Sequence, residues 1–197
     1  MVALKDSRRK SRRLSELKIL RDESRVRDRF RELVIEEQEL RRMSQTTGIV
    51  DVDLLRTLFD AGFREDSIDA LQLLPITKVS WASGSVTPEE SKRAIKAIDW
   101  SHAIGNPKAI DLFTDWLDQQ PGDEFWSYWE GYLEARALNE DPRLFRAEGF
   151  ALLRCAERVA VASGGLFGYG TICAEERECL ERIRLNYLLP SSSPAEQ

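Results

Sequence analysis

Histidine and cysteine are the scarce residues of this sequence. Its 197 residues include one histidine, His102, and three cysteines, Cys155, Cys173 and Cys179. A single histidine excludes a His-rich metal site. A Ser or Cys catalytic triad would have to use His102 as its base, but the place of His102 near a predicted helix end is typical of a side chain that caps helix carbonyls. Because the cysteines are odd in number and form no Cys-X-X-Cys pair, we expect free thiols and a reducing, cytoplasmic location.

Long apolar runs are also missing. The longest uncharged run, Val159 to Ala174, contains four glycines, whereas a membrane helix needs about 20 consecutive apolar residues. The charged first residues are not followed by an apolar segment, so we expect neither a secretory signal nor a transmembrane segment. The glycine-rich stretch 164–170 lacks the Lys-Ser/Thr pair and the preceding strand of a phosphate-binding loop, and it predicts a turn.

No segment alternates apolar and polar residues over the length of a strand, while helix start and stop signals recur. The sequence therefore predicts an all-α domain over residues 50–188, followed by a disordered tail, 189–197. Asp51 or Asp53, Asp123 and the prolines at 88, 107 and 142 mark helix starts, and Pro75 must kink or divide its helix. The domain is a helical bundle of about six or seven helices, expected at about 51–62, 67–82, 88–104, 107–119, 124–138, 142–163 and 174–187.

The first 45 residues form a separate, basic arm. They carry 14 Lys or Arg against 9 Asp or Glu, whereas the rest of the chain carries 15 against 25. Residues 7–43 contain no Gly or Pro and predict one long charged helix, and the stretch 44–48 predicts a hinge. Glu37 interrupts the apolar positions, so a two-stranded coiled coil is compatible with the pattern but not required by it. These positions are Leu14, Leu17, Val26, Phe30, Leu33, Val34 and Leu40.

A basic cluster lies near the start of the arm and is the candidate anion-binding site: Arg8, Arg9, Lys10, Arg12 and Arg13. Such a cluster attracts the phosphates of nucleic acid or of a membrane surface. The rest of the arm interleaves acids, the body is acidic, and the cluster contains no aromatic residue for base stacking. Two interpretations stay open, namely a solvated or self-associating helix and an anion-binding arm.

One helix-loop-helix pattern occurs twice in the chain. In each copy a helix ends in Ala-Ser-Gly, and after a loop a small residue and Glu-Glu open the next helix. The first copy runs from Lys78 to Glu90 and the second from Arg158 to Glu176, with a longer loop in the second. The repeat predicts an internally duplicated bundle.

This pattern resembles the TerB-like family of tellurite-resistance proteins, in which a helix ends in Ala-Asp-Gly and paired acids open the next helix. The resemblance covers roughly residues 50–188. It implies an all-helical fold with a pseudo-twofold arrangement, and in some members divalent metal is bound at the acidic loops. Here Ser83 and Ser163 stand where the family has its loop aspartates.

The candidate metal ligands are the paired carboxylates Glu89, Glu90, Glu175 and Glu176. Calcium and magnesium require several oxygen ligands, usually with more than one carboxylate. The same glutamates are explained without metal, since acids at the first turn of a helix cap it and face the positive end of its dipole. We therefore expect metal-binding loops that are weakened or lost, and no cofactor unless a divalent metal is retained.

Aromatic residues concentrate in the predicted helix 124–138. Phe125, Trp129 and Tyr132 share one face and are expected in the core, while Trp126 or Tyr128 would lie outside it and suit a partner. With no catalytic constellation, the sequence predicts a noncatalytic TerB-like interaction or scaffold module, which the resemblance associates with stress. Its expected partner is a protein or a second copy of the chain. The alternatives are a divalent-metal-binding protein and a binder of nucleic acid or anionic surfaces.

Overall fold

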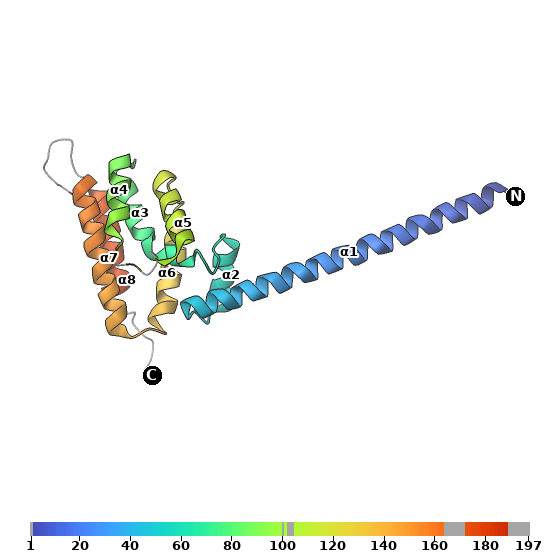
Figure 1. Ribbon diagram of the computed structural model, residues 1–197, viewed down its shortest axis with the longest axis horizontal. Coiled ribbons are helices and arrows are strands. Elements are labelled where there is room, and N and C mark those ends of the chain that lie inside the picture. The colour runs from blue at the N-terminus through green and yellow to red at the C-terminus, as the bar shows by residue number, and fades with distance from the viewer. Residues whose placement is uncertain (1, 100, 102–104, 164–171, 189–197) are drawn as a thin grey trace. The chain divides into compact units, whose positions relative to one another are not determined.

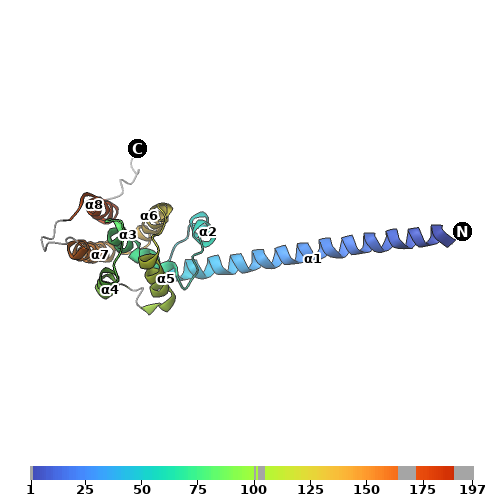
Figure 2. The same ribbon diagram turned by 90° about the horizontal axis from the view of Figure 1, so that it is seen from above.

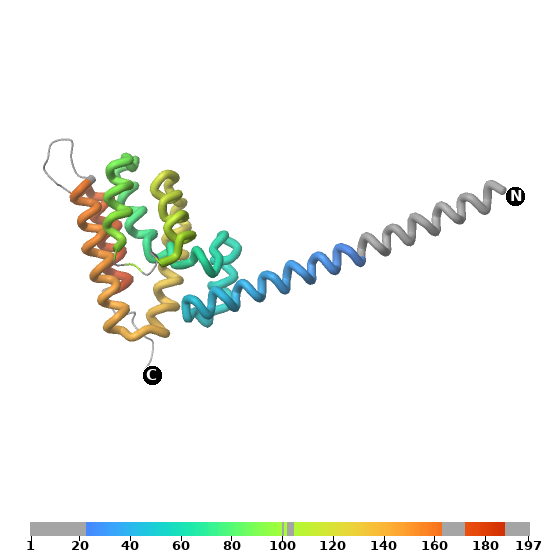
Figure 3. The backbone as a smooth tube through the Cα atoms, viewed as in Figure 1, coloured from blue at the N-terminus to red at the C-terminus, as the bar shows by residue number. Residues whose placement is uncertain are grey.

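The computed structural model describes the backbone of residues 2–99, 101, 105–163 and 172–188, and within these ranges the side chains of 23–99, 101, 105–162 and 172–187 (Figure 3). The prediction of an all-α bundle is confirmed, because the described ranges contain helices and no strand (Figure 1). The elements are α1 (Val2–Thr47), α2 (Val52–Asp60), the 3₁₀ helix η1 (Ile68–Leu73), α3 (Leu74–Trp81), α4 (Pro88–Ala97), α5 (Pro107–Asp118), α6 (Glu124–Ala137), α7 (Pro142–Ser163) and α8 (Ala174–Leu188).

The chain divides into two units, Met1–Arg41 and Arg42–Gln197, and the boundary falls inside α1. The described part of the first unit is a single stretch of helix, and the second unit, which we call the body, holds the helices from α2 to α8. No described helix is long and apolar enough to cross a membrane.

The predicted hinge at 44–48 is wrong for its first four residues, which are helical. The Thr47 hydroxyl donates to the carbonyl oxygen of Met43 at 2.8 Å, and the Ser44 hydroxyl donates to that of Ile49 at 2.6 Å. The first bond lies within the last turn of α1, and the second ties that turn to the residue that follows Gly48. The helix stops at Gly48, whose φ of 72° suits glycine.

Helix α3 lies at the centre of the body. Seven of its eight residues are buried, as expected for a helix that is covered on all sides. Figure 2 shows it surrounded by α4, α5, α6, α7 and α8, and contacts with each of these helices agree with that view. The other elements of the body are therefore held in place largely by what they bury against α3.

Pro75 divides the predicted helix 67–82 in two. Residues 68–73 form η1, and Pro75 lies in the first turn of α3, where its missing N–H leaves no intrahelical bond unmade.

The helix expected to run to 104 ends earlier, because α4 stops at Ala97. The N–H of Ser101 instead closes a turn on the carbonyl oxygen of Ile98 at 3.0 Å. The Ser101 hydroxyl donates to the buried side-chain oxygen of Gln72 at 3.1 Å. The last predicted residues of this helix, 102–104, lie outside the described ranges.

Local start signals place most of the remaining boundaries. Of the two candidate caps for α2, Asp51 is the one used, since its carboxylate accepts from the N–H groups of Asp53 and Leu54, each at 3.0 Å. Asn106 caps α5 in the same way. Asp123 occupies the N-cap position of α6 as expected, but it makes no side-chain capping bond, and its carboxylate instead lies 3.4 Å from the ammonium group of Lys78.

Candidate functional site

The helices that follow the two repeated loops begin with the same capping arrangement. At α4 the Glu90 carboxylate accepts from the N–H of Thr87 at 2.7 Å, and the Thr87 hydroxyl accepts from the N–H of Glu90 at 3.3 Å. At α8 the Glu176 carboxylate accepts from the N–H of Cys173 at 2.8 Å, and the Cys173 sulfur lies 3.4 Å from the N–H of Glu176. Both are capping boxes, which satisfy backbone donors at a helix start.

The first glutamate of each pair also interacts within its own helix start. Glu89 accepts from the ammonium group of Lys92 at 3.0 Å on the exposed face of α4. At α8 a hydrogen bond from its own backbone N–H lowers the pKa of Glu175, and the Cys173 thiol lowers it further. Both carboxylates lie at the amino end of a helix, where the helix dipole favours a negative charge.

Within the described ranges, no group of three or more His, Cys, Asp or Glu side chains is placed to hold a metal ion. Ser83 uses its hydroxyl to donate to the carbonyl oxygen of Ser85 at 3.2 Å, and the side chain of Ser163 lies outside the described residues. Metal binding by Glu89, Glu90, Glu175 and Glu176 stays a prediction.

The two copies of the repeated pattern correspond to α3–α4 and α7–α8, which lie side by side in the body. Helix α7 contacts α3, α4 and α8, and α8 contacts α3 (Figure 1). The Arg93 guanidinium on α4 donates to the carbonyl oxygen of Ala162, near the end of α7, at 2.9 Å. Cys155 of α7 donates its thiol proton to the carbonyl oxygen of Ala97 at 3.1 Å.

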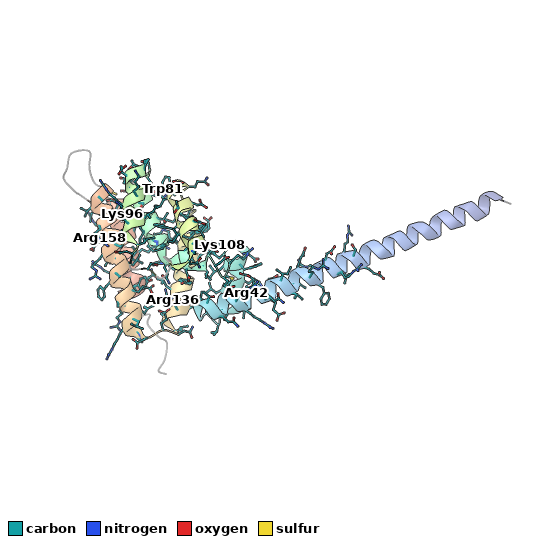
Figure 4. All side chains as sticks on the ribbon, in the orientation of Figure 1. Arg42, Trp81, Lys96, Lys108, Arg136 and Arg158 are labelled. Carbon is teal, nitrogen blue, oxygen red and sulfur yellow. The ribbon has the colours of Figure 1, made fainter. Side chains whose placement is uncertain are left out.

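A buried polar network joins α6, α7 and α8, and sequence reasoning missed it. Arg136 is 6% exposed, and its two terminal nitrogens donate to the Glu148 carboxylate, each at 2.8 Å. Its third donor binds Glu140 at 2.6 Å, and Glu148 also accepts from the Tyr187 hydroxyl at 2.8 Å. Figure 4 shows Arg136 in the body. A bidentate, charge-assisted pair of this kind fixes the relative position of two helices.

Two tyrosines belong to the same network. Tyr132 stacks under the Arg136 guanidinium, 5.4 Å from the ring centroid, and its hydroxyl lies 3.5 Å from the Gln72 amide nitrogen. Burial raises the pKa of Tyr132 to about 12, and burial together with the Glu148 charge raises that of Tyr187 well above its usual value. Both hydroxyls are therefore protonated near neutral pH, where that of Tyr187 donates to Glu148 and that of Tyr132 accepts from Gln72.

A cavity of about 570 Å³ opens beside this network. Its wall comes from the end of α1, η1, α6 and α7, and it holds the carboxylates of Asp69, Glu140, Asp141 and Glu148 and the guanidinium of Arg136. The Arg136 and Glu148 charges are already paired with each other. The short turn between α6 and α7 is the one sequence signal that could have brought Arg136 and Glu148 together, since it makes these helices neighbours.

Neither of the cysteines near α8 has the character of a nucleophile. Burial raises the pKa of the Cys179 thiol to about 11, with a further contribution from Glu178. The pKa of Cys173 is also raised, first by burial and then by Glu175 and Glu176. Thiolates are the reactive form, so both groups are protonated and unreactive at neutral pH.

The aromatic side chains of α6 are divided between two packed clusters. Trp129 and Tyr132 are buried as predicted, and Trp126, expected as one candidate for the outside, is buried as well. Its ring lies 5.4 Å from that of Trp129 and 4.7 Å from the Arg182 guanidinium. Phe125 is only half-buried, as is Tyr128, and each ring packs edge-on against Phe63.

The exposed apolar side chains of the first unit form the clearest candidate interaction surface. Val26 is 61% exposed, Phe30 68% and Leu33 46%. Their spacing of three to four residues places them on one face of α1. We call these three residues the apolar stripe. Val34 is exposed beside the stripe, and Ile35 is exposed on another face of the helix.

The predicted anion-binding side chains Arg8, Arg9, Lys10, Arg12 and Arg13 lie outside the described residues, although the helical backbone of α1 includes their positions. His102 and the glycine-rich stretch 164–170 also lie outside the described ranges. Anion binding by the arm stays a prediction.

Comparison of the chain with protein-family models, with curated proteins and with solved structures finds no match.

Proposed function

We propose that this chain is a noncatalytic, TerB-like interaction module whose body carries a long helix that binds a protein partner through the apolar stripe. The observation that supports this most directly is the exposure of Val26, Phe30 and Leu33 on one face of α1. Apolar side chains that line up on an exposed helix face are typical of helices that pack against another protein.

The charged side chains around the stripe are consistent with a surface that is exposed until a partner binds. Arg29 pairs with Glu32 at 3.2 Å and Arg41 with Glu37 at 2.6 Å, and all four side chains are more than half exposed. Such pairs contribute little to stability, about 0.3–0.5 kcal/mol each on a helix surface. They support the helix and its solubility and leave the apolar face uncovered.

The TerB-like part of the proposal rests on the repeated helix-loop-helix. The copies α3–α4 and α7–α8 pack together, and both second helices begin with a capping box that uses the second glutamate of the pair. A carboxylate that caps a helix is not free to leave it for a metal ion without cost to the helix. We therefore propose loops that have kept their structural role and have lost metal binding.

Photo-crosslinking in cells tests the interaction role. A photoreactive phenylalanine analogue is placed at position 30 and, as the matched control, at position 150, because Phe150 is 51% exposed on α7 of the body. We expect a discrete crosslinked species from position 30 that disappears when Val26 and Leu33 are changed to Ser. Equal crosslinking from both positions, or none from position 30, would contradict the proposal.

Isothermal titration of the chelator-stripped chain with Ca²⁺, Mg²⁺, Mn²⁺ and Zn²⁺ tests the loss of metal binding. We expect no stoichiometric heat from any of them. Stoichiometric binding that is lost in Glu89→Gln or Glu175→Gln would contradict the proposal. These two substitutions leave the capping boxes of Glu90 and Glu176 intact, so the loss would identify the substituted carboxylates as metal ligands.

A further inference from the structure

Two acids share the face of α1 that carries the apolar stripe. Glu23 and Glu37 each lie seven residues from Phe30, one before it and one after it. Because seven residues make about two helical turns, both positions lie close to the line of the stripe. Both side chains are exposed, that of Glu37 to 64%. The apolar stripe therefore has an exposed carboxylate at each end.

We propose that the partner of the apolar stripe is a helix of a different protein, which carries one Lys or Arg opposite Glu23 and another opposite Glu37. This inference rests on the proposed function, since it specifies the partner of the same surface. The apolar side chains of the partner helix pack on the stripe, and its two cations pair with the two acids. Charged residues at such positions commonly decide which helices pair with each other.

Charge repulsion disfavours a second copy of the chain in parallel orientation. When Phe30 of one copy packs beside Phe30 of the other, each acid of the face lies beside the same acid of the other copy. Like charges placed against each other across an interface strongly oppose association. A parallel pair of identical helices is therefore opposed at both ends of the stripe.

An antiparallel second copy places acids against apolar side chains. Packing Phe30 beside Leu33 sets the residue seven after Phe30 beside the residue seven before Leu33, and these residues are Glu37 and Val26. Packing Phe30 beside Val26 instead sets Glu23 beside an apolar side chain in the same way. A carboxylate covered by an apolar group loses water without gaining a partner, which is costly. Both acids are matched only by a helix that supplies cations.

The pair that Glu37 makes within its own helix leaves room for a cation from the partner. Arg41 lies 2.6 Å from the Glu37 carboxylate, but the two side chains are 72% and 64% exposed. Such a pair is weak because water screens it. A partner helix that covers the stripe displaces this water, so a second cation opposite Glu37 is attracted more strongly than the first.

Sedimentation equilibrium of the full chain tests the exclusion of a second copy. We expect a monomer throughout the concentration range in which the peptides described next bind. A dimer that is weakened by Phe30→Ser, and not by the matched control Phe150→Ser on α7, would overturn the inference, because the stripe would then bind its own copy.

Designed helical peptides test the chemistry of the partner. Each peptide spans about three heptads and sets leucines against the stripe and one Lys against each acid. One version has the spacing for parallel pairing and one for antiparallel pairing, and a control for each carries Glu in place of both Lys. By fluorescence anisotropy with the full chain, we expect one Lys peptide to bind roughly 100-fold more tightly than its control, about tenfold for each charge. Equal binding of Lys and Glu peptides, or no binding, would overturn the inference.

Charge reversal in the chain locates the binding surface. Glu23→Lys and Glu37→Lys made together should reverse the preference, so that the Glu peptide becomes the tighter ligand. Phe30→Ser should abolish binding of the Lys peptide, and Phe150→Ser should leave it unchanged. Circular dichroism checks that all variants keep their helix content. A preference for the Lys peptide that survives charge reversal would overturn the inference, because the acidic body rather than α1 would then attract the peptide.

The crosslinking experiment separates failure of this inference from failure of the proposed function. A crosslink from position 30 to a different protein, with equal binding of the Lys and Glu peptides, would overturn the inference and keep the proposed function. Absence of any crosslink from position 30 would overturn both. The expected result is a crosslink to a different protein together with a peptide preference that follows the charges at positions 23 and 37.

Discussion

The two units of the chain place apolar side chains in opposite environments. In the first unit, the side chain of Phe30 on α1 is 68% exposed, while in the body that of Ile76 on α3 is fully buried. The helix of the first unit is maintained by residue propensity and by weak surface ion pairs, whereas α3 has eight residues and depends on what packs around it. Substitutions of the same kind should therefore lower the free energy of unfolding strongly in the body and only slightly in the first unit.

The largest expected effect is at the buried ion pair. Glu148→Gln removes the charge that pairs with Arg136, and breaking a buried pair costs about 3 kcal/mol or more. Glu32→Gln, which breaks the exposed pair with Arg29, should leave the free energy of unfolding unchanged. Tryptophan fluorescence during urea unfolding measures this, because all five tryptophans lie beyond residue 45. Similar losses in both variants would remove the contrast between the units.

A matched pair of isoleucines tests packing. Ile76→Ala leaves a cavity beside the central helix, and the free energy of unfolding should fall by about 3 kcal/mol. Ile35 is 55% exposed on α1, and Ile35→Ala should have no measurable effect on the stability of the body, with helix content unchanged or slightly raised because alanine has the higher helix propensity. Urea unfolding followed by tryptophan fluorescence measures the stability of the body, and circular dichroism measures the helix content.

Alkaline pH should destabilise the body through its buried tyrosines. The pKa of Tyr132 is about 12 in the folded chain, against about 10 when unfolded, because burial disfavours the phenolate. The protonated Tyr132 side chain stabilises the folded chain fully below pH 10, and this stabilisation is lost as the pH rises from about 10 to 12. The loss in the free energy of unfolding is on the order of 2–3 kcal/mol. The first unit contains no tyrosine. In urea titrations across this range, Tyr132→Phe should lose less stability than the unchanged chain, and parallel losses would contradict the assignment.

The sequence correctly predicted the helix starts and the helix break that depend only on residues close by in the chain. Thr87-Pro88 and Asn106-Pro107 begin helices as expected, and Pro75 divides one, because caps and proline act within a turn or two. The end of α4 at Ala97 could not be predicted in this way, since the chain that follows it is tied by Ser101 to Gln72 on η1, a residue distant in sequence. At the candidate site, the capping role of Glu90 was predictable from its spacing to Thr87, but the exposure of Phe30 required knowing which helix faces are covered.

The smallest expected difference in the free energy of unfolding is between the loss of Lys78 on α3 and the loss of Arg41 on α1. Lys78 is buried on α3, and its ammonium group donates to the carbonyl oxygens of Pro121 and Gly122 at 2.9 and 2.8 Å. Lys78→Met leaves these two acceptors without their donor, and the free energy of unfolding should fall by about 1–2 kcal/mol. Arg41→Met, which breaks the exposed pair with Glu37, should leave it unchanged.

A third variant identifies which partner of Lys78 matters. The Asp123 carboxylate also lies 3.4 Å from the ammonium group, but its side chain is fully exposed, so water screens the attraction. Asp123→Asn should therefore have little effect in the urea unfolding that detects the loss in Lys78→Met. If Asp123→Asn proved as destabilising as Lys78→Met, the ion pair with Asp123 rather than the hydrogen bonds to the two backbone carbonyls would account for the stabilising effect of Lys78.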